Sequence, residues 1–483
     1  MIRDLSQLNP GTLVLNSTAQ VIQSLASLFA RVIYTFDEKY ILTGTVRRDG
    51  SFKFAEGHQY GTFPSGALAW KVKQESFLKD ASWLTDFKLR GSYGVSGNQS
   101  TIAPFQSPAL YQAGSAPTTS NNFGYPFGKT FQPGVVTIQP ANPNLRWETD
   151  YQTDLGTDIS FLKGNLNFTM DYFNRISKDF LLNIPVPPQT GFLYETQNVG
   201  SMTNKGFEFA LNYNHSIHDF KFGAGVTLSV LRNKLTSLSA GTNSITNPIT
   251  TLGMNGQIAL PGNGWTVFSQ TNIGQPVGEF YGYKSLGIIQ SQAQLNALNT
   301  AAKAKGFDSY QQASTAPGGR LYADVNGDGH ITADDQTSLG SPQPKFFGGL
   351  NLDGSYKSWN FNLFFYGNFG NKILNYQESN LEAFQNRSFA GIQNISQEYY
   401  ANAWTPTNPY NTYARILYND NAVGNSLPSS AWIQNGSYVK LKNFTVGYTF
   451  PAELARKLAI SRLRLYASTQ NLFTITKIQR FRS

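Results

Sequence analysis

The sequence contains no cysteine, which excludes a disulfide framework, a cysteine zinc site and a thiol nucleophile. Charged side chains are also scarce, at 14% of the 483 residues, whereas a typical soluble domain carries roughly 25%. No run of about 20 apolar residues is present, so no helix is expected to span a bilayer. No run of Lys and Arg is longer than a pair such as Arg47-Arg48. A nucleic-acid partner is therefore not expected, because it would require a concentrated basic surface.

Aromatic residues, at 14%, are as frequent as charged ones, and apolar and polar residues alternate along most of the chain. Because successive strand side chains point to opposite faces, this period of two predicts strands with one apolar and one polar face. The two candidate helices are residues 291–305 and 452–458, so the predicted fold class is all-β. The alternation is found in residues 40–47, 62–73, 87–95, 165–173, 206–214, 222–230, 359–366, 444–450 and 463–473.

The connections between these segments alternate between very short and very long. The short ones are residues 37–39, 162–164, 218–219 and 357–358, and the long ones are 96–144, 182–204, 236–278, 290–345 and 368–437. Such asymmetry is typical of a transmembrane β-barrel, which has short turns on one side and long extracellular loops on the other. A soluble β-sandwich or β-helix is the rival interpretation. Aromatic girdles at the two membrane interfaces are expected from Trp70, Trp83, Trp147, Tyr172, Trp359 and Tyr448.

Seven segments follow one another along the chain, beginning with residues 31–70, RVIYTFDEKYILTGTVRRDGSFKFAEGHQYGTFPSGALAW. The others are LRGSYGVSGNQ (89–99), NPNLRWETDYQTDLGTD (142–158), NVGSMTNKGFEFAL (198–211), DVNGDGHITADD (324–335), SYVKLKNFTVGYTFP (437–451) and LRLYASTQNLFTITK (463–477). In this order and spacing they resemble the C-terminal barrel region of SusC/RagA-family TonB-linked outer-membrane proteins, from about residue 24 onward.

The resemblance implies a large antiparallel transmembrane β-barrel, in a family with about 22 strands. About a dozen strands are expected here. Residues 1–23 would be an irregular lead-in, and residues 24–483 a partial barrel with the plug domain and the final closing strand absent. The implied location is the outer membrane of a Gram-negative, Bacteroidota-like cell. The implied function is import of a large nutrient, an oligosaccharide (glycan) or a peptide, with a SusD-like surface lipoprotein and with TonB acting through the plug region.

Residues 324–335 match the spacing of a calcium loop within an extracellular connection. Side-chain oxygens stand at loop positions 1, 3 and 5, a glycine at 6, a backbone carbonyl at 7 and an acid at 12. The predicted Ca²⁺ ligands are Asp324, Asn326, Asp328, the carbonyl of His330, and Asp335. An Asx-rich turn without metal is the alternative.

No enzyme is predicted. The four histidines, His58, His215, His218 and His330, lack a nucleophile or acid at motif spacing, and the neighbouring Glu148 and Asp150 carry no catalytic signature. Loop aromatics (Phe123, Tyr125, Phe127, Phe131 and Trp265) are candidates for stacking on sugars, for packing between loops or for packing onto the capping lipoprotein. Two other functions stay open: a soluble or surface all-β, calcium-stabilised binding or adhesive protein, and a passive porin-like channel.

Overall fold

The computed structural model describes residues 23–113, 124–128, 130–192, 194–239, 243–246, 258–259, 265–266, 269–382, 395–417, 424–425, 427–457 and 459–478. The expected lead-in, residues 1–23, lies almost entirely outside these ranges. None of the described helices is long and apolar enough to cross a membrane.

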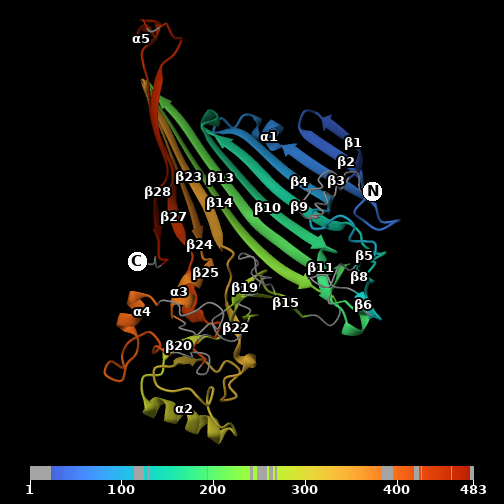
Figure 1. Cartoon of the computed structure of the whole chain (residues 1–483). Coiled ribbons are helices and arrows are strands. Elements are labelled where there is room, and N and C mark those ends of the chain that lie inside the picture. The colour runs from blue at the N-terminus through green and yellow to red at the C-terminus, as the bar shows by residue number, and fades with distance from the viewer. Residues whose placement is uncertain are drawn as a thin grey trace, which may run out of the picture.

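Within the described ranges, twelve strands form one antiparallel sheet in which chain order is preserved from one edge to the other. Figure 1 shows that this sheet is long and strongly curved. Its strands have 11 to 18 residues each, enough to cross a bilayer when tilted, which takes about 9–11 residues. The strands are β1 (Leu25–Phe36), β2 (Tyr40–Ser51), β3 (Tyr60–Lys71), β4 (Leu84–Asn98), β9 (Glu148–Phe161), β10 (Leu166–Lys178), β13 (Ser201–Ile217), β14 (Phe220–Ser237), β23 (Phe346–Tyr356), β24 (Trp359–Phe369), β27 (Tyr438–Thr449) and β28 (Arg464–Thr476).

The all-β prediction and the expected count of about a dozen strands are thus confirmed. The sheet does not close on itself, because β1 and β28 form its two edges and pair with no further strand among the described residues. It is therefore an open part of a barrel.

Each strand of the sheet has two chemically different faces. On β10 the apolar Phe168, Met170 and Tyr172 alternate with the polar Thr169 and Asp171. The antiparallel register places apolar residues of neighbouring strands opposite one another; Tyr172, for example, pairs with Phe207 of β13. Apolar side chains therefore form one continuous face, and many of them remain exposed, including Leu155, Leu211 and Val226.

The short connections occur where the sequence predicts them. Residues 37–39 join β1 to β2, His218 and Asp219 join β13 to β14, and Lys357 and Ser358 join β23 to β24. Backbone conformation explains why such short turns suffice. Residues with positive φ, such as His218 (φ 51°) and Lys357 (φ 51°), match the right-handed twist of two paired strands. All these turns lie at the same end of the sheet (Figure 1), here called the short-turn end.

The long connections are more ordered than the sequence indicates. The connection from β10 to β13 holds the hairpin β11 (Leu181–Pro185) and β12 (Tyr194–Asn198). Those after β14 and β24 contain, in their described parts, short strands and the helices α2 (Gln292–Ala304), α3 (Tyr376–Glu382) and α4 (Gln397–Asn402). Of these helices the sequence predicts only α2, because the others lie in segments too short to show a period. The remaining predicted helix is confirmed as α5 (Ala452–Lys457), between β27 and β28.

The connections after β14 and β24 pack against each other as one body, here called the loop unit. Tyr283 forms a parallel bridge with Ser429, and the Tyr322 hydroxyl donates to the carbonyl of Gly424 at 2.7 Å. The guanidinium of Arg320 lies over the ring of Trp432, which is almost fully buried. Segments that are a hundred residues apart in sequence therefore share one small core.

A second small core lies where β9 begins. Trp147 packs with Phe54 and Phe63, and its indole N–H donates to the carbonyl of Gln59 at 3.0 Å. The indole is only 7% exposed. The prediction that Trp147 contributes to an interfacial girdle is therefore wrong, because the loop after β2 folds over it.

Other predicted girdle residues do gather at the short-turn end, on the apolar face. Tyr40 packs between Phe36 and Trp70, Trp83 stacks on Phe161, and Trp359 packs on Tyr448.

Glu75, in the connection from β3 to β4, contacts two of these aromatic residues. One of its carboxylate oxygens accepts from the Tyr40 hydroxyl at 2.6 Å and from the Trp70 indole at 3.0 Å. These hydrogen bonds, from Tyr40 above all, lower the pKa of Glu75.

The replacement Glu75→Gln tests whether these hydrogen bonds to Glu75 stabilise the fold. A carboxylate whose pKa is lowered on folding stabilises the fold above its ordinary pKa of about 4.3, and this contribution is lost as the pH falls through the lowered value. We expect the heat-unfolding midpoint in detergent, followed by tryptophan fluorescence, to fall less in Glu75→Gln than in the unmodified chain between about pH 6 and about pH 3. Glu56→Gln, at an exposed acid, is the control. Equal acid sensitivity of all three proteins would contradict the assignment.

Candidate functional site on the concave face

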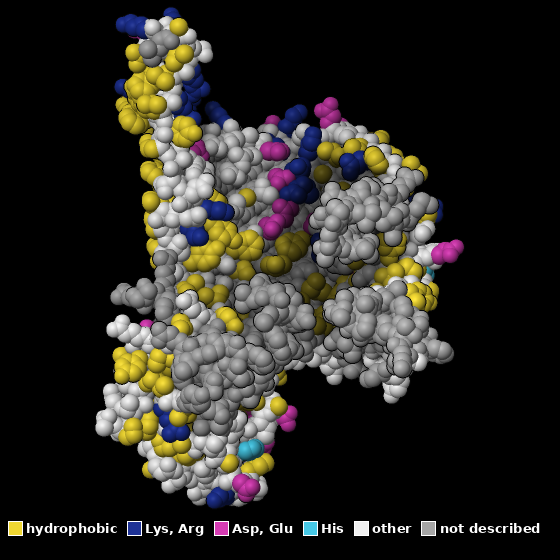
Figure 2. All heavy atoms as spheres, in the orientation of Figure 1, with side chains coloured by type: hydrophobic (Ala, Val, Ile, Leu, Met, Phe, Trp, Pro, Cys, Tyr) yellow, Lys and Arg dark blue, Asp and Glu magenta, His cyan; other side chains and the backbone are white. Residues whose placement is uncertain are grey.

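The polar face of the sheet is concave, and its charged side chains are concentrated on three neighbouring strands. Figure 2 shows basic and acidic side chains side by side in the hollow of the sheet. Strand alternation positions them, because residues two apart share a face. Lys88 and Arg90 come from β4, Asp154 and Asp158 from β9, and Asp171 from β10.

Arg90 is the centre of this charged network. Its Nε lies 2.9 Å from Oδ2 of Asp158, and its Nη2 lies 2.9 Å from Oδ1 of Asp171. Lys88 Nζ lies 3.0 Å from the same Asp158 oxygen. Asp171 belongs to β10, so the Arg90 side chain reaches across the whole of β9.

Gly156 makes this crossing possible. It is the β9 residue that pairs with both Arg90 and Asp171. A Cβ atom at this position would lie 2.2 Å from Oδ1 of Asp171 and 2.8 Å from Cζ of Arg90. Only a residue without a side chain leaves room for the ion pair over the strand.

A second ion pair lies closer to the long loops. The Asp150 carboxylate accepts hydrogen bonds from Arg175 and from the Ser177 hydroxyl, and Asp150 is only 2% exposed. Its neighbour Glu148 accepts from the Asn98 amide at 3.3 Å. The two acids singled out in the sequence are thus members of structural hydrogen-bond networks.

Between these networks lies a cavity of about 760 Å³ on the concave face. Its lining includes Arg90, Asp154, Arg175 and Glu208. Glu208 stands directly opposite Asp171 in the register of β10 and β13, and like charges in that position destabilise a sheet. The cavity offers charge and hydrogen-bonding groups for binding a polar ligand.

The predicted calcium residues lie in the loop unit, between β21 (Arg320–Tyr322) and β22 (Thr337–Gly340). The backbone wraps around the loop's own side chains. Asp324 accepts from the amides of Gly327 and Gly329 at 2.7 and 2.8 Å, and Asp328 accepts from the amide of His330 at 2.8 Å. The His330 ring turns away to stack on Phe307.

Asp335 closes this loop from the other end. It is fully buried, and its two oxygens accept from the amides of Val325 and Thr332, each at 2.8 Å. The loop is held to the rest of the unit by Tyr310, whose hydroxyl donates to the Tyr322 carbonyl at 2.9 Å and accepts from the Asp324 amide at 3.2 Å. Burial raises the pKa of Tyr310.

The donor set of the loop consists entirely of oxygen atoms, which suits a hard cation such as Ca²⁺. Over the described residues, no three Asp, Glu or His side chains form a group that would hold a metal by themselves. Asn326 and the His330 carbonyl would therefore be needed beside the three aspartates. Calcium stays a prediction at this point.

The other sequence candidates contribute no common site. His215 stacks on Tyr213 and His218 forms a turn. Of the loop aromatics, Phe123 lies outside the described residues, and so do the side chains of Tyr125, Phe127, Phe131 and Trp265. The Arg90 network, in contrast, was not predicted. Its signal is the charged residues that share one face of β4, β9 and β10, but that pattern says nothing of which strands are neighbours.

Comparisons with known proteins agree with this architecture. A family model described as "TonB dependent receptor-like, beta-barrel" matches residues 3–315. TonB-dependent receptor P3 of Formosa agariphila is 35% identical over 456 residues, which cover 94% of this chain and 41% of that protein. TonB-dependent receptor SusC of Bacteroides thetaiotaomicron is 29% identical over 465 residues, again 94% of this chain and 41% of that protein. The chain thus spans less than half the length of these relatives.

Among solved structures, the RagAB peptide transporter has a similar fold. The TM-score is 0.74 at 24% sequence identity, over 94% of this chain and 44% of that chain. A second RagAB structure, a peptide importer in its closed-closed state, has a TM-score of 0.75 over 99% of this chain and 47% of that one.

The replacement Gly156→Ala tests whether the Arg90–Asp171 ion pair requires a residue without a side chain at this position of β9. The new methyl group displaces the Arg90–Asp171 pair, and we expect a loss of about 1–2 kcal/mol in the free energy of unfolding in detergent, the range for a half-buried ionic hydrogen bond. Gly91→Ala on β4 is the matched control, because its Cβ would have an ordinary contact of 3.5 Å with Leu155. Equal stability of the two variants would show that the ion pair does not depend on Gly156.

Proposed function

The chain belongs to the TonB-dependent receptor β-barrel family, and from this membership we propose that it serves in outer-membrane import of a large nutrient. The nutrient is an oligosaccharide or a peptide, too large for passive diffusion. The producing cell is Gram-negative and Bacteroidota-like. TonB supplies the energy through a plug region, and a SusD-like surface lipoprotein captures the nutrient.

The two-faced sheet is the observation that carries this proposal. Its apolar face exposes Leu155, Leu211, Val226 and many similar side chains, which a bilayer would cover. Its concave face holds the charged network and the polar cavity described above, as the wall of a water-filled passage would. Strands of 11 to 18 residues suit the thickness of the hydrocarbon layer.

The direction of transport follows from the two ends of the sheet. Long connections of bacterial barrels face the outside and short turns face the periplasm, so the loop unit would meet the nutrient first. It also exposes aromatic side chains, such as Tyr400 and Tyr410, which are 72% and 85% exposed. These are suited to contact with a surface lipoprotein, because aromatic residues are enriched at protein interfaces.

The names of the relatives do not decide between an oligosaccharide and a peptide as the nutrient. The RagAB structures are titled peptide transporter and peptide importer, whereas SusC is named only as a receptor. Their names describe receptors and transporters, in line with the absence of a predicted active site. Both nutrient classes therefore belong to the proposal.

Deletion of the gene in the producing organism tests import. We expect slower growth on one polymeric source, either mixed oligosaccharides or a protein digest, and unchanged growth on the corresponding monomers. The chain should sediment with the outer membrane and need detergent for release. Recovery in the aqueous fraction would instead support the soluble calcium-stabilised protein. Steady ion conductance in planar bilayers would support the passive porin.

We also propose that the loop at residues 324–335 binds Ca²⁺. Asp324, Asn326, Asp328, the His330 carbonyl and Asp335 would hold the ion. The support is the donor chemistry and the fit of the loop backbone around those side chains. The ion would offset two of the three negative charges of Asp324, Asp328 and Asp335 and so stiffen the loop unit.

Calorimetric titration of the whole chain in detergent tests this second proposal. We expect Ca²⁺ to bind with a dissociation constant of about 10⁻⁴–10⁻³ M, typical of extracellular calcium modules, and to raise the unfolding temperature by mass action. Asp328→Ala should abolish both effects. Asp334→Ala is the control, since Asp334 is an exposed acid of the same loop outside the ligand set. Absence of binding at about 10 mM Ca²⁺, well above that range, would remove the proposal.

A further inference from the structure

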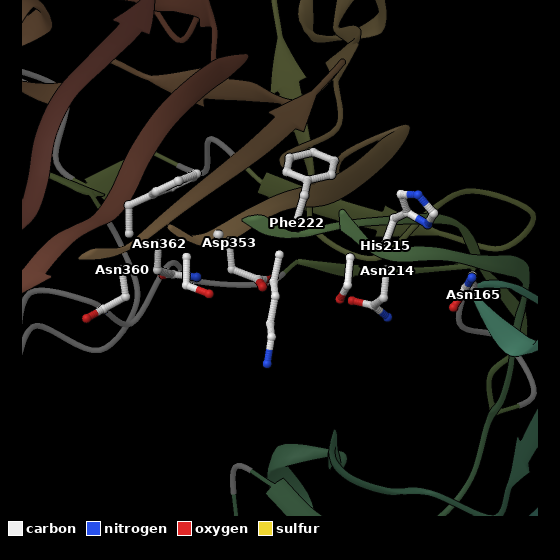
Figure 3. Close-up of a pocket in the computed structure, with 12 residues that line it drawn as sticks. Asn165, Asn214, His215, Phe222, Asp353, Asn360 and Asn362 are labelled. Carbon is white, nitrogen blue, oxygen red and sulfur yellow. The ribbon is translucent and has the colours of Figure 1, made fainter. Parts of the chain in front are cut away.

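The convex, apolar face of the sheet carries a group of basic side chains at the end nearest the long connections. Strand alternation identifies the face on which they lie. Figure 3 shows that Phe222 of β14 projects to the side opposite to Asn214 and Asp353, which belong to the polar, concave face. Arg232 and Lys234 stand at even positions of the same strand. Because residues two apart share a face, both lie on the convex side with Phe222.

Lys205 of β13 is next to these two cations. It pairs with Arg232 in the register of β13 and β14, and Lys234 is the following residue of β14 on the same face. All three side chains are exposed. Lys205, Arg232 and Lys234 are here called the basic cluster.

The positive charge of the basic cluster has no acidic partner in the described part of the chain. Like charges that stand directly opposite each other on paired strands destabilise a sheet, and Lys205 and Arg232 are such a pair. Among the described residues, none of the three cations forms an ion pair with a carboxylate. Nη1 of Arg232 instead donates to the carbonyls of Leu231 and Lys345, at 3.0 and 2.9 Å. The cluster therefore offers positive charge in a fixed position to an anion from outside the chain.

The basic cluster begins where the apolar band of the convex face ends. On β14 this band extends from Phe220 through Val226 to Val230, about the length of the 9–11 tilted residues that cross the hydrocarbon layer. On β13 it ends at Phe207, which pairs with Val230 and stands two positions from Lys205. Both strands thus change from apolar to basic at the same level. In a membrane that is the level of the lipid headgroups.

The loop unit covers the concave side of β14 at this level and leaves the convex side open. Leu235 is only 1% exposed, and its amide donates to the carbonyl of Gln275 at 3.0 Å. The amide of Val277 donates to Oδ1 of Asn233 at 2.9 Å. Lys234, between these two residues of β14, stays exposed on the other side. A molecule that covers the basic cluster must therefore approach from the membrane side of the sheet.

We propose that the basic cluster binds the phosphate group of a lipid in the outer leaflet. The inference goes beyond import of a nutrient, and it rests on the proposed location in the outer membrane with the long connections facing outward. Phosphate oxygens accept short, charge-assisted hydrogen bonds from ammonium and guanidinium groups. A phosphate between Lys205 and Arg232 would also offset the repulsion between these two cations. Basic groups at the edge of a hydrocarbon layer are suited to this contact, because they bind anionic headgroups.

A lipid fits this position better than a soluble anion does. Phe207 and Leu228, the nearby apolar residues of the same face, are 40% and 37% exposed. The acyl chains of a lipid would cover them and gain from the burial of apolar surface, whereas a free phosphate would not. Both β13 and β14 are paired on each side, so their backbone groups are already used. The side chains alone are left to bind the headgroup.

Heat unfolding of the whole chain in a neutral detergent, followed by tryptophan fluorescence, tests the proposal. The probes are lipid A, which is a phosphorylated glycolipid, the same lipid after removal of its phosphate groups, and inorganic phosphate at the same concentration. We expect lipid A to raise the unfolding midpoint, because a ligand that binds only the folded chain stabilises it by mass action. The dephosphorylated lipid and inorganic phosphate should leave the midpoint unchanged. The dependence of the midpoint on lipid A concentration gives the dissociation constant.

A variant that combines Lys205→Gln, Arg232→Gln and Lys234→Gln removes the cluster. We expect the affinity for lipid A to fall about fivefold for each cation, and therefore about a hundredfold for all three. Without lipid, this variant should unfold at no lower temperature than the unmodified chain, since the opposed like charges are gone. Lys205→Gln alone should lose about fivefold, and it serves if the triple variant does not fold.

The matched control combines Lys79→Gln, Lys163→Gln and Lys221→Gln, three exposed lysines at the short-turn end. It changes the net charge equally and should keep its affinity for lipid A. The proposal is overturned by any of four results: no effect of lipid A, an equal effect of the dephosphorylated lipid, an equal effect of inorganic phosphate, or an equal loss of affinity in the control. None of these results would contradict import itself, because growth of the deletion strain measures import independently of lipid binding.

Discussion

Pairing of backbone hydrogen-bonding groups is the constraint on which this structure depends. In hydrocarbon there is no water to satisfy an exposed N–H or C=O group, and each unsatisfied group costs several kcal/mol. The twelve described strands of the sheet satisfy their backbone groups by pairing in chain order. The two faces of the sheet therefore differ only in their side chains. The two outer edges, β1 and β28, are the places where the same demand calls for further strands in a membrane.

Glycine shapes the concave face as much as the polar residues do. Gly156 lets Arg90 reach Asp171 across β9, and Gly223 and Gly225 let carboxamides lean over β14. The face is thereby divided into a charged region and a nearly neutral one. The chemistry of this face therefore changes along the strands, from salt bridges near mid-sheet to carboxamides near the short turns.

The loop unit is stabilised in a different way, by the burial of apolar side chains in a small core of its own. Its stability depends on buried aromatics such as Tyr322 and Trp432, contributed by two separate connections. Residues 324–335 are fastened to that core through Tyr310. If residues 324–335 became more or less ordered, the change would therefore reach the surface of the loop unit, which is proposed to meet the nutrient first.

Local sequence was sufficient for the all-β class, the strand positions, the short turns and the family, because a period of two and turn chemistry are properties of neighbouring residues. It also located the loop at residues 324–335, whose spacing is local. Tertiary structure alone decided that Arg90 meets Asp171, that Trp147 is buried rather than interfacial, and that two distant connections share one core. The physical reason is register: alternation assigns a residue to a face, but only the pairing of strands determines which residues on that face become neighbours.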